Sequence, residues 1–102
     1  MDITFPDRPP HYDANRLRLT FSATAGDLHI ECAITAEALE DHFGAASLRE
    51  ADLCSAFLAH RAAIEKAAAR MIEATKSDAV TLHSGYFRMY GEADDAGKDR
   101  SR

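Results

Sequence analysis

Tryptophan is absent from this chain of 102 residues, and glycine, proline and cysteine are scarce, with five, three and two residues respectively. So few glycines and prolines exclude a collagen-like or low-complexity chain, and a hydrophobic content of 46% excludes an intrinsically disordered one. The two cysteines form no CxxC pair, so their spacing supports neither a zinc ribbon nor a redox motif. The length predicts one domain with a modest core.

Positive charge is also in short supply, because 12 Lys and Arg stand against 17 Asp and Glu, a net charge of −5. A chain without a basic stripe lacks the usual phosphate contacts, so we do not expect a nucleic-acid partner. No run of about 18 apolar residues is present, and we expect no membrane association. Without a secretory signal at the N-terminus, Cys32 and Cys54 are expected to be reduced thiols in the cytoplasm.

The common catalytic and nucleotide-binding motifs are missing: P-loop, GxGxxG, GxSxG and HExxH. The five histidines are scattered, and no two have the i, i+4 spacing of metal ligands on a helix. Glu40-Asp41-His42 is a polar cluster beside a predicted helix end, and its ordinary interpretation is solvated surface. We therefore predict no catalytic residue, no metal site and no cofactor, and we do not expect an enzyme.

The longest periodic segment predicts one helix over residues 48–76. Ser47 and Glu50 have the spacing of a capping box, and no Gly or Pro interrupts the residues up to Lys76. At about 100° per residue, one apolar stripe is formed by Leu53, Phe57, Ile64 and Met71, with Ala67, Ala68 and Thr75 beside them.

A second, weaker apolar line runs along the flank of this helix and consists of Cys54, Leu58 and Ile72. Leu58 lies about 100° around the helix from Phe57, so both lines cannot face the same layer. Two interpretations remain open. Another helix of the chain covers the flank, or it is the interface of a homodimer.

Two segments alternate between apolar and polar residues and predict an antiparallel hairpin, 17–23 with 28–35. With residues 24–27 as the turn, the predicted partners are Ala23 with Leu28, Phe21 with Ile30, Leu19 with Cys32 and Leu17 with Ile34. Every inward residue then meets an inward residue. We expect one dry and one wet face, with His29, Glu31 and Ala33 on the wet one.

The remaining segments are shorter. A short helix is predicted over 36–43 with Thr35 as its cap and Gly44 at its end, and strands over 79–83 and, at the edge, 3–5. Residues 86–90 fit a strand or a helical turn equally well, and 91–102 are expected to be a disordered polar tail after a domain of residues 1–90. The fold class is α+β, with an antiparallel sheet packed on the long helix.

Candidate binding residues lie around the ridge that Phe57 and Ile64 form on the long helix. His60 and Arg61 flank that ridge, and the ordinary interpretation is an edge-of-core histidine and an arginine paired with Glu65. The functional alternative is a pocket that they form with Tyr12 of the loop at 7–15 and with the aromatic residues Tyr86 and Phe87.

The order of several motifs resembles one protein family. These are Phe5-Pro6, Tyr12-Asp13, Arg16, Leu19-x-Phe21, Gly26, Ala38-Leu39, Phe57-x-x-His60-Arg61-x-x-Ile64-Glu65-x-x-Ala68, Leu82 and Tyr86-Phe87. The pattern is similar to small bacterial proteins catalogued as domain of unknown function 1488, over nearly all of residues 3–87. The resemblance implies an α+β fold in a bacterial cytoplasm and brings no activity, substrate or cofactor with it. Tyr86 departs from the family, in which an Asp commonly precedes the final Phe.

Three hypotheses for function follow. The leading one is a non-enzymatic interaction or adaptor protein with an unidentified protein partner, which could also be a second copy of the chain. The alternative is a small-ligand-binding protein with its pocket near Tyr12, His60 and Arg61. A nucleic-acid-associated protein is the third, and the net charge disfavours it.

Overall fold

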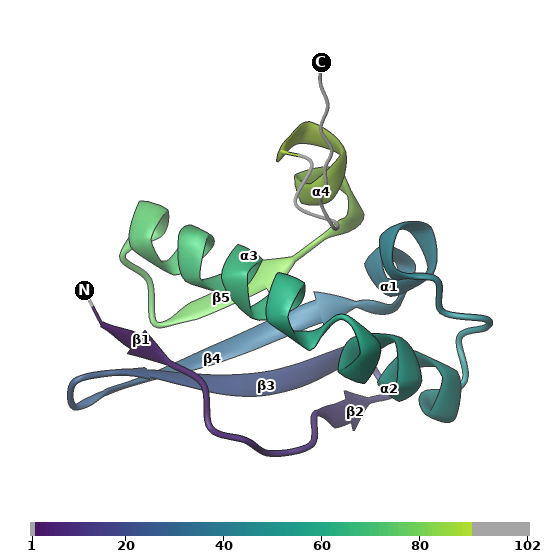
Figure 1. Ribbon diagram of the computed structural model, residues 1–102, viewed down its shortest axis with the longest axis horizontal. Coiled ribbons are helices and arrows are strands. Elements are labelled where there is room, and N and C mark those ends of the chain that lie inside the picture. The colour runs from purple at the N-terminus through teal and green to yellow at the C-terminus, as the bar shows by residue number, and fades with distance from the viewer. Residues whose placement is uncertain (1, 91–102) are drawn as a thin grey trace.

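The computed structural model describes residues 2–90, and the expected disordered tail, residues 91–102, lies outside the described part. Five strands and four helices follow one another in the order β1 (Ile3–Thr4), β2 (His11–Asp13), β3 (Arg18–Ala25), β4 (Leu28–Thr35), α1 (Ala36–Phe43), α2 (Glu50–Ala59), α3 (Arg61–Thr75), β5 (Ala79–Leu82) and α4 (Ser84–Tyr90). The five strands form one sheet, and α2 and α3 run across one of its faces (Figure 1). The predicted α+β class is confirmed.

The sheet has the strand order β1-β3-β4-β5, and β2 pairs with the same edge of β3 as β1 does. β1, β2 and β4 are antiparallel to β3, but β5 is parallel to β4. The expectation of an all-antiparallel sheet is therefore wrong for β5. The three helices between β4 and β5 return the chain to the same end of the sheet, which makes the next pairing parallel.

The hairpin forms as predicted, but in a different register. Its observed partners include Ala25 with Leu28, Ala23 with Ile30, Phe21 with Cys32 and Leu19 with Ile34. The loop is two residues long, with Gly26 at φ 62° in its first position, where a type II′ turn needs a positive φ. The predicted register was wrong by two residues, a shift that keeps every side chain on its face.

The shift has consequences at the ends of the hairpin. Leu17 and Leu28, predicted to face inward, are 47% and 45% exposed. Leu17 lies before β3 with φ 49°, and its carbonyl accepts the N–H of Ala36. Ala33, predicted to face water, is buried, because it stands on a central strand between Thr20 of β3 and Thr81 of β5.

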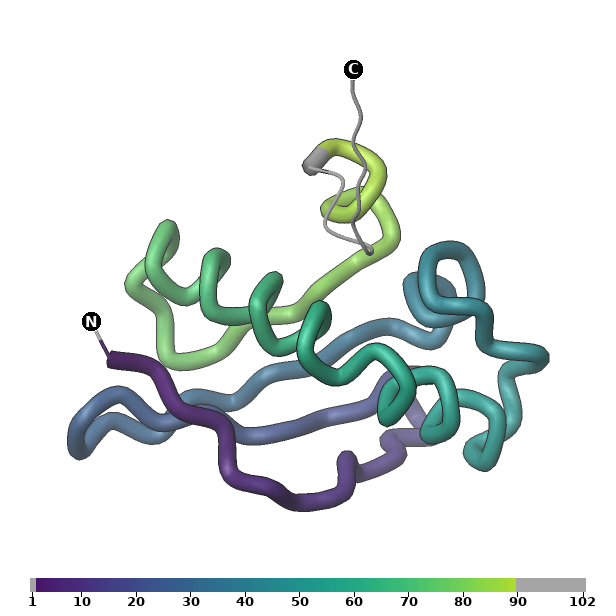
Figure 2. Tube along the Cα trace, viewed as in Figure 1, coloured from purple at the N-terminus to yellow at the C-terminus, as the bar shows by residue number. Residues whose placement is uncertain are grey.

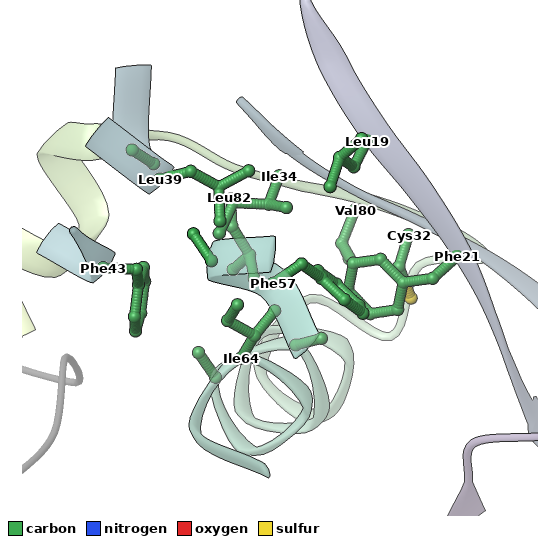
Figure 3. Close-up of a cluster of buried hydrophobic side chains, with 14 of the residues drawn as sticks. Leu19, Phe21, Cys32, Ile34, Leu39, Phe43, Phe57, Ile64, Val80 and Leu82 are labelled. Carbon is green, nitrogen blue, oxygen red and sulfur yellow. The ribbon is translucent and has the colours of Figure 1, made fainter. Parts of the chain in front are cut away.

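The core lies between the helices and one face of β3 and β4, which we call the dry face. It consists of Leu19, Phe21 and Ala23 of β3 and Ile30, Cys32 and Ile34 of β4. Phe57 of α2 is fully buried above it, and its ring meets Phe21 edge-on at 5.1 Å between centroids (Figure 3). Fully burying such a side chain stabilises the fold by about 1.5–3 kcal/mol.

The predicted long helix is two helices. His60 has φ −122° and ψ 25°, and its N–H is shared between the carbonyls of Ala56 and Phe57, so α2 ends there and α3 begins at Arg61. No Gly or Pro marks this break. The ring of His60 instead packs 5.4 Å from Phe43 of α1, a tertiary contact that the helical pattern does not reveal.

The start of α2 also differs from the prediction. Arg49 is the N-cap residue of α2, and no side chain caps the helix. The Ser47 hydroxyl donates to Asp52 at 2.6 Å and accepts from the N–H of Arg49, so it caps a turn and the predicted capping box with Glu50 is wrong. At the other end of α3, Lys76 takes the left-handed conformation with φ 55°.

The short helix α1 follows the prediction closely. The hydroxyl of Thr35 accepts the N–H of Ala38, and Gly44 ends the helix with φ 74°. Residues 86–90, which the sequence left undecided, belong to the helix α4.

Candidate functional site

The first feature of the site is a loop that leaves the sheet, residues 5–10, here called the proline loop. Three of its six residues are prolines, which have no N–H to offer to the neighbouring strand. The chain pairs with β3 at Thr4, swings away from it and pairs again from His11 (Figure 2). Proline in this loop therefore opens a gap along the edge of β3.

The gap lies opposite Ser22. β1 is registered with Thr24 and Ala25, and β2 with residues 18–20, so neither strand reaches the part of β3 between them. In a two-residue hairpin the closing pair exchanges both main-chain hydrogen bonds, and these bonds then alternate along the strand. Counting from Ala25, the N–H and C=O of Ser22 point away from β4 and toward the gap. Within residues 2–90, no main-chain hydrogen bond joins the proline loop to Ser22.

A hollow of about 290 Å³ occupies this place, and we call it the loop hollow. Thr20, Phe21 and Ser22 of β3 form its floor. His29 and Glu31 of β4 line one side, and the proline loop with His11 lines the other. Apart from Phe21, the strand residues belong to the face of the sheet opposite the helices, here called the open face.

Arg61 fixes the proline loop from the helix side. Its guanidinium donates to the carbonyl of Pro6 at 3.1 Å, forms an ion pair with Glu65 at 2.7 Å and lies 5.2 Å above the ring of Phe57. The predicted pairing with Glu65 is confirmed. Because these contacts occupy much of the guanidinium, Arg61 holds the wall of the hollow in place more than it offers a free charge.

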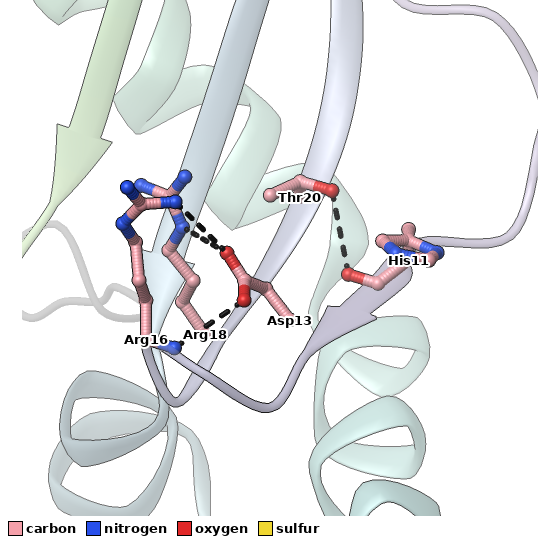
Figure 4. A network of polar contacts seen from close by, with 5 residues as sticks. All are labelled: His11, Asp13, Arg16, Arg18 and Thr20. Atoms are coloured by element: carbon pink, nitrogen blue, oxygen red, sulfur yellow. Dashed lines mark hydrogen bonds and ion pairs between the residues drawn. The ribbon is translucent and has the colours of Figure 1, made fainter.

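A polar network fixes the other end of the loop, where β2 meets β3 (Figure 4). The carboxylate of Asp13 accepts from the Arg16 N–H at 3.3 Å and from Arg18 Nε at 3.2 Å. Desolvation alone would raise the pKa of Asp13, but these hydrogen bonds and the charges of both arginines lower its pKa below the ordinary value. Thr20 donates to the carbonyl of His11 at 3.4 Å, so His11 is tied to the floor of the hollow.

Four polar side chains of the hollow are exposed and have no partner among the residues that the structure describes. They are Arg8, His11, His29 and Glu31. Arg8 uses only its main-chain N–H, which donates to the carbonyl of Pro6 at 2.9 Å. The hollow therefore presents charges and hydrogen-bonding groups that the fold itself does not use.

The five predicted binding residues do not share one pocket. Arg61 lines the loop hollow, whereas Tyr12 packs at the edge of the core. His60, Tyr86 and Phe87 belong to an aromatic cluster centred on Phe43, which meets both His60 and Phe87. The predicted pocket near Tyr12, His60 and Arg61 is therefore not formed.

The predicted interface residues also separate. Ile72 is 1% exposed and belongs to the core, so its place in an interface is wrong. Cys54 is partly buried against the core, and burial, followed by the charge of Glu50, raises the pKa of its thiol. Leu58 is 56% exposed. Of the three, only Leu58 presents a large apolar surface to water.

Sequence reasoning missed the residue that docks α4. Ser84 is a buried polar residue, 3% exposed, and its hydroxyl donates to Asp41 at 2.7 Å. His42 Nε2 lies 3.1 Å from both the hydroxyl and the carbonyl of Ser84. Asp41 and His42 thus hold a helix more than 40 positions away in the chain. Because Ser84 is buried and its hydroxyl already has partners, this arrangement is structural.

Two further findings concern the part of the chain that the structure covers. No helix there is long enough and apolar enough to cross a membrane. No three residues of the types that bind metals come together there in a way that could hold an ion.

The fold and the hollow define a small α+β protein with a ligand-sized depression at the edge of its open sheet face. Over residues 3–83 the sequence matches the model of the family described as "Protein of unknown function (DUF1488)", and the chain belongs to this family. The match ends before α4, so Tyr86 and Phe87 lie beyond it. Comparison with curated proteins and with solved structures gave no match.

Proposed function

We propose that this protein is a non-enzymatic binding protein that holds a small polar ligand in the loop hollow. This proposal rests on the convergence of three chain segments, β3, β4 and the proline loop, on one depression in which the side chains of Arg8, His11, His29 and Glu31 pair with no described residue. A volume of about 290 Å³ is at the lower end of ligand pockets, so the ligand is small.

The arrangement of the hydroxyl groups supports binding over catalysis. Ser22 and Thr20 are the hydroxyl residues of the hollow, and among the described residues neither forms a hydrogen bond to a histidine ring. An activated hydroxyl nucleophile needs such a base within hydrogen-bond reach. The free thiols Cys32 and Cys54 support a reducing compartment, and with the family resemblance we take this to be a bacterial cytoplasm.

The test is a titration of the labelled full-length protein, followed by NMR, with mixtures of polar metabolites: amino acids, dicarboxylates, sugars, sugar phosphates and polyamines. We expect at least one compound to shift the amide signals of Ser22, His29 and Glu31. Ser22→Tyr should fill the hollow and abolish binding, whereas Ser55→Tyr, on the exposed surface of α2, should not. If no mixture shifts these signals at about 5 mM, where even a Kd near 1 mM gives majority occupancy, the proposal is wrong.

A second function is supported by Leu58, which lies on the outer side of α2 and is 56% exposed. We infer that this flank, Leu58 with the partly buried Cys54, contacts a protein, and a second copy of the chain is the simplest partner. Sedimentation of the wild type and of Leu58→Glu at high micromolar concentration tests this. A dimer that the substitution converts to a folded monomer supports the interface. A monomeric wild type, or an equal effect of the control Leu28→Glu on the far end of the hairpin, contradicts it.

A further inference from the structure

The two sides of the loop hollow carry opposite charges. Glu31 belongs to β4, and its register partner across the strands is Ser22 on the floor. Arg8 belongs to the proline loop, on the other side of β3. Since β4 and the loop flank β3 on opposite edges, Glu31 and Arg8 line the hollow from opposite sides of Ser22.

Neither charge is neutralised within the fold. Glu31 and Arg8 form no ion pair with any residue in the described range 2–90, in contrast to Arg61, which is paired with Glu65. Their formal charges cancel, and the charge of Arg61, which also lines the hollow, is compensated by Glu65. A simple anion placed at Arg8 would meet the repulsion of Glu31, and a simple cation at Glu31 that of Arg8.

Between the charges, the floor supplies neutral hydrogen-bonding groups. The main-chain N–H and C=O of Ser22 point toward the gap, and the hydroxyls of Ser22 and Thr20 lie on the open face. These groups can accept from an ammonium and donate to a carboxylate. A molecule with both ionic groups on one short skeleton would satisfy the floor and both walls at once.

We propose that the loop hollow binds a small zwitterion with one carboxylate and one ammonium group, the chemistry of a free amino acid. The carboxylate lies at Arg8 with the N–H of Ser22, and the ammonium lies at Glu31. This assignment rests on the proposed function, because it names the ligand class of the same site. The charged side chains are exposed, and exposed ion pairs are weak, so a Kd of about 0.1–1 mM is expected.

The experiment is calorimetric titration of the full-length protein with the individual L-amino acids. The best binder is then compared with two analogues of the same side chain, one without the ammonium and one without the carboxylate. The amino acid should bind about tenfold more tightly than either analogue. Each analogue loses one charge-assisted contact and leaves the charge of Arg8 or of Glu31 unpaired. Inorganic phosphate serves as a probe for a plain anion.

Two variants test which side chain binds the carboxylate and which binds the ammonium group. Arg8→Gln should remove the preference for the amino acid over the amine, and Glu31→Gln the preference over the carboxylic acid. The matched controls are Arg49→Gln and Glu40→Gln, which remove the same charges from exposed positions outside the hollow. The folded state of each variant is checked by circular dichroism.

The outcomes separate this proposal from the function on which it rests. If the carboxylic acid or phosphate binds as tightly as the amino acid, the zwitterion is wrong but a ligand site remains. If no amino acid binds while another metabolite shifts the signal of Ser22, the ligand class is again wrong and the binding function stands. If Arg8→Gln and Glu31→Gln leave both preferences unchanged, the placement is wrong.

Discussion

The two faces of the β3–β4 hairpin differ in what they do, although they are made of alternate residues of the same strands. On the dry face, Phe21 and Cys32 are buried beneath α2 and α3. On the open face, Ser22 follows Phe21, Glu31 precedes Cys32, and both border the loop hollow. The covered face holds the fold together, and the open face carries the proposed ligand site. A substitution of Phe21 or Cys32 should therefore affect stability, and one of Ser22 or Glu31 binding, whereas Ala33, buried on the open face between β3 and β5, is an exception.

The largest effect is expected at Phe57, whose ring covers the dry face. Phe57→Ala removes a fully buried aromatic side chain that contacts Phe21 edge-on, and should cost about 3–5 kcal/mol of unfolding free energy. Leu58→Ala, one position along the same helix but exposed, should cost less than about 0.5 kcal/mol. Urea denaturation measures both. A loss below about 1 kcal/mol for Phe57→Ala would show that the dry face does not carry the stability.

The ionisation of the buried Cys32 thiol tests the same difference between the dry face and the open face. Burial, with smaller effects of the charges on Glu31 and Glu65, raises the pKa of the Cys32 thiol from its ordinary value of 9.0 to about 12. The folded protein thus disfavours the thiolate, so this contribution to stability is intact below pH 9 and is lost as the pH rises toward 12. We expect the alkaline loss of stability to be shallower in Cys32→Ala.

At pH 8 an aromatic disulfide reagent should modify Cys32 of the native protein only as fast as the protein unfolds. The partly buried Cys54 is the internal comparison and should react first. Labelling followed by mass spectrometry distinguishes the two. Rapid labelling of Cys32 in the folded protein would mean that the helices do not seal the dry face.

Arg61 connects the two faces, and its loss should have an intermediate effect. Arg61→Gln breaks the ion pair with Glu65, the hydrogen bond to Pro6 and the contact with the Phe57 ring, at a cost of about 1–3 kcal/mol. Hydrogen exchange at the Arg8 amide, which bonds to Pro6, should become faster as the proline loop loosens.

Arg61→Lys should not restore the clamp, because an ammonium cannot reproduce the planar fork of donors. Arg49→Gln, an exposed arginine at the start of α2, is the control and should change neither quantity. Full rescue by lysine would show that Arg61 acts only through its positive charge.

The smallest effect on stability is expected on the open face. Ser22→Ala and Glu31→Gln remove groups that make no side-chain hydrogen bond to any described residue, so each should change the unfolding free energy by less than about 0.5 kcal/mol. Thermal melts measure this. A larger loss would mean that these side chains support the fold, and the contrast between the faces would fail.

The candidate site was only partly accessible to sequence reasoning. The predicted loop at 7–15 is a loop around Pro9 and Pro10 but contains the strand β2 (His11–Asp13), where the prediction is wrong, and the predicted pairing of Arg61 with Glu65 is confirmed. His29 and Glu31 were placed on the wet face, but nothing in their spacing connects them with Arg8 or His11. The hollow depends on a gap in strand pairing, and although the prolines indicate where the chain leaves the strand, they do not reveal which distant residues border the gap.

The sequence by itself determined what depends on neighbours within about four positions: the alternation of the hairpin, the cap of α1 at Thr35, the stop at Gly44 and the burial of Phe57. The alternation left the hairpin register open, because a shift of two residues leaves the alternation unchanged, and the two-residue turn Gly26-Asp27 fixes the register. Tertiary structure alone decided the break at His60, the parallel pairing of β5 and the docking of α4 through Ser84. Each of these is fixed by a partner at least 17 positions away in the chain, beyond the reach of any local pattern.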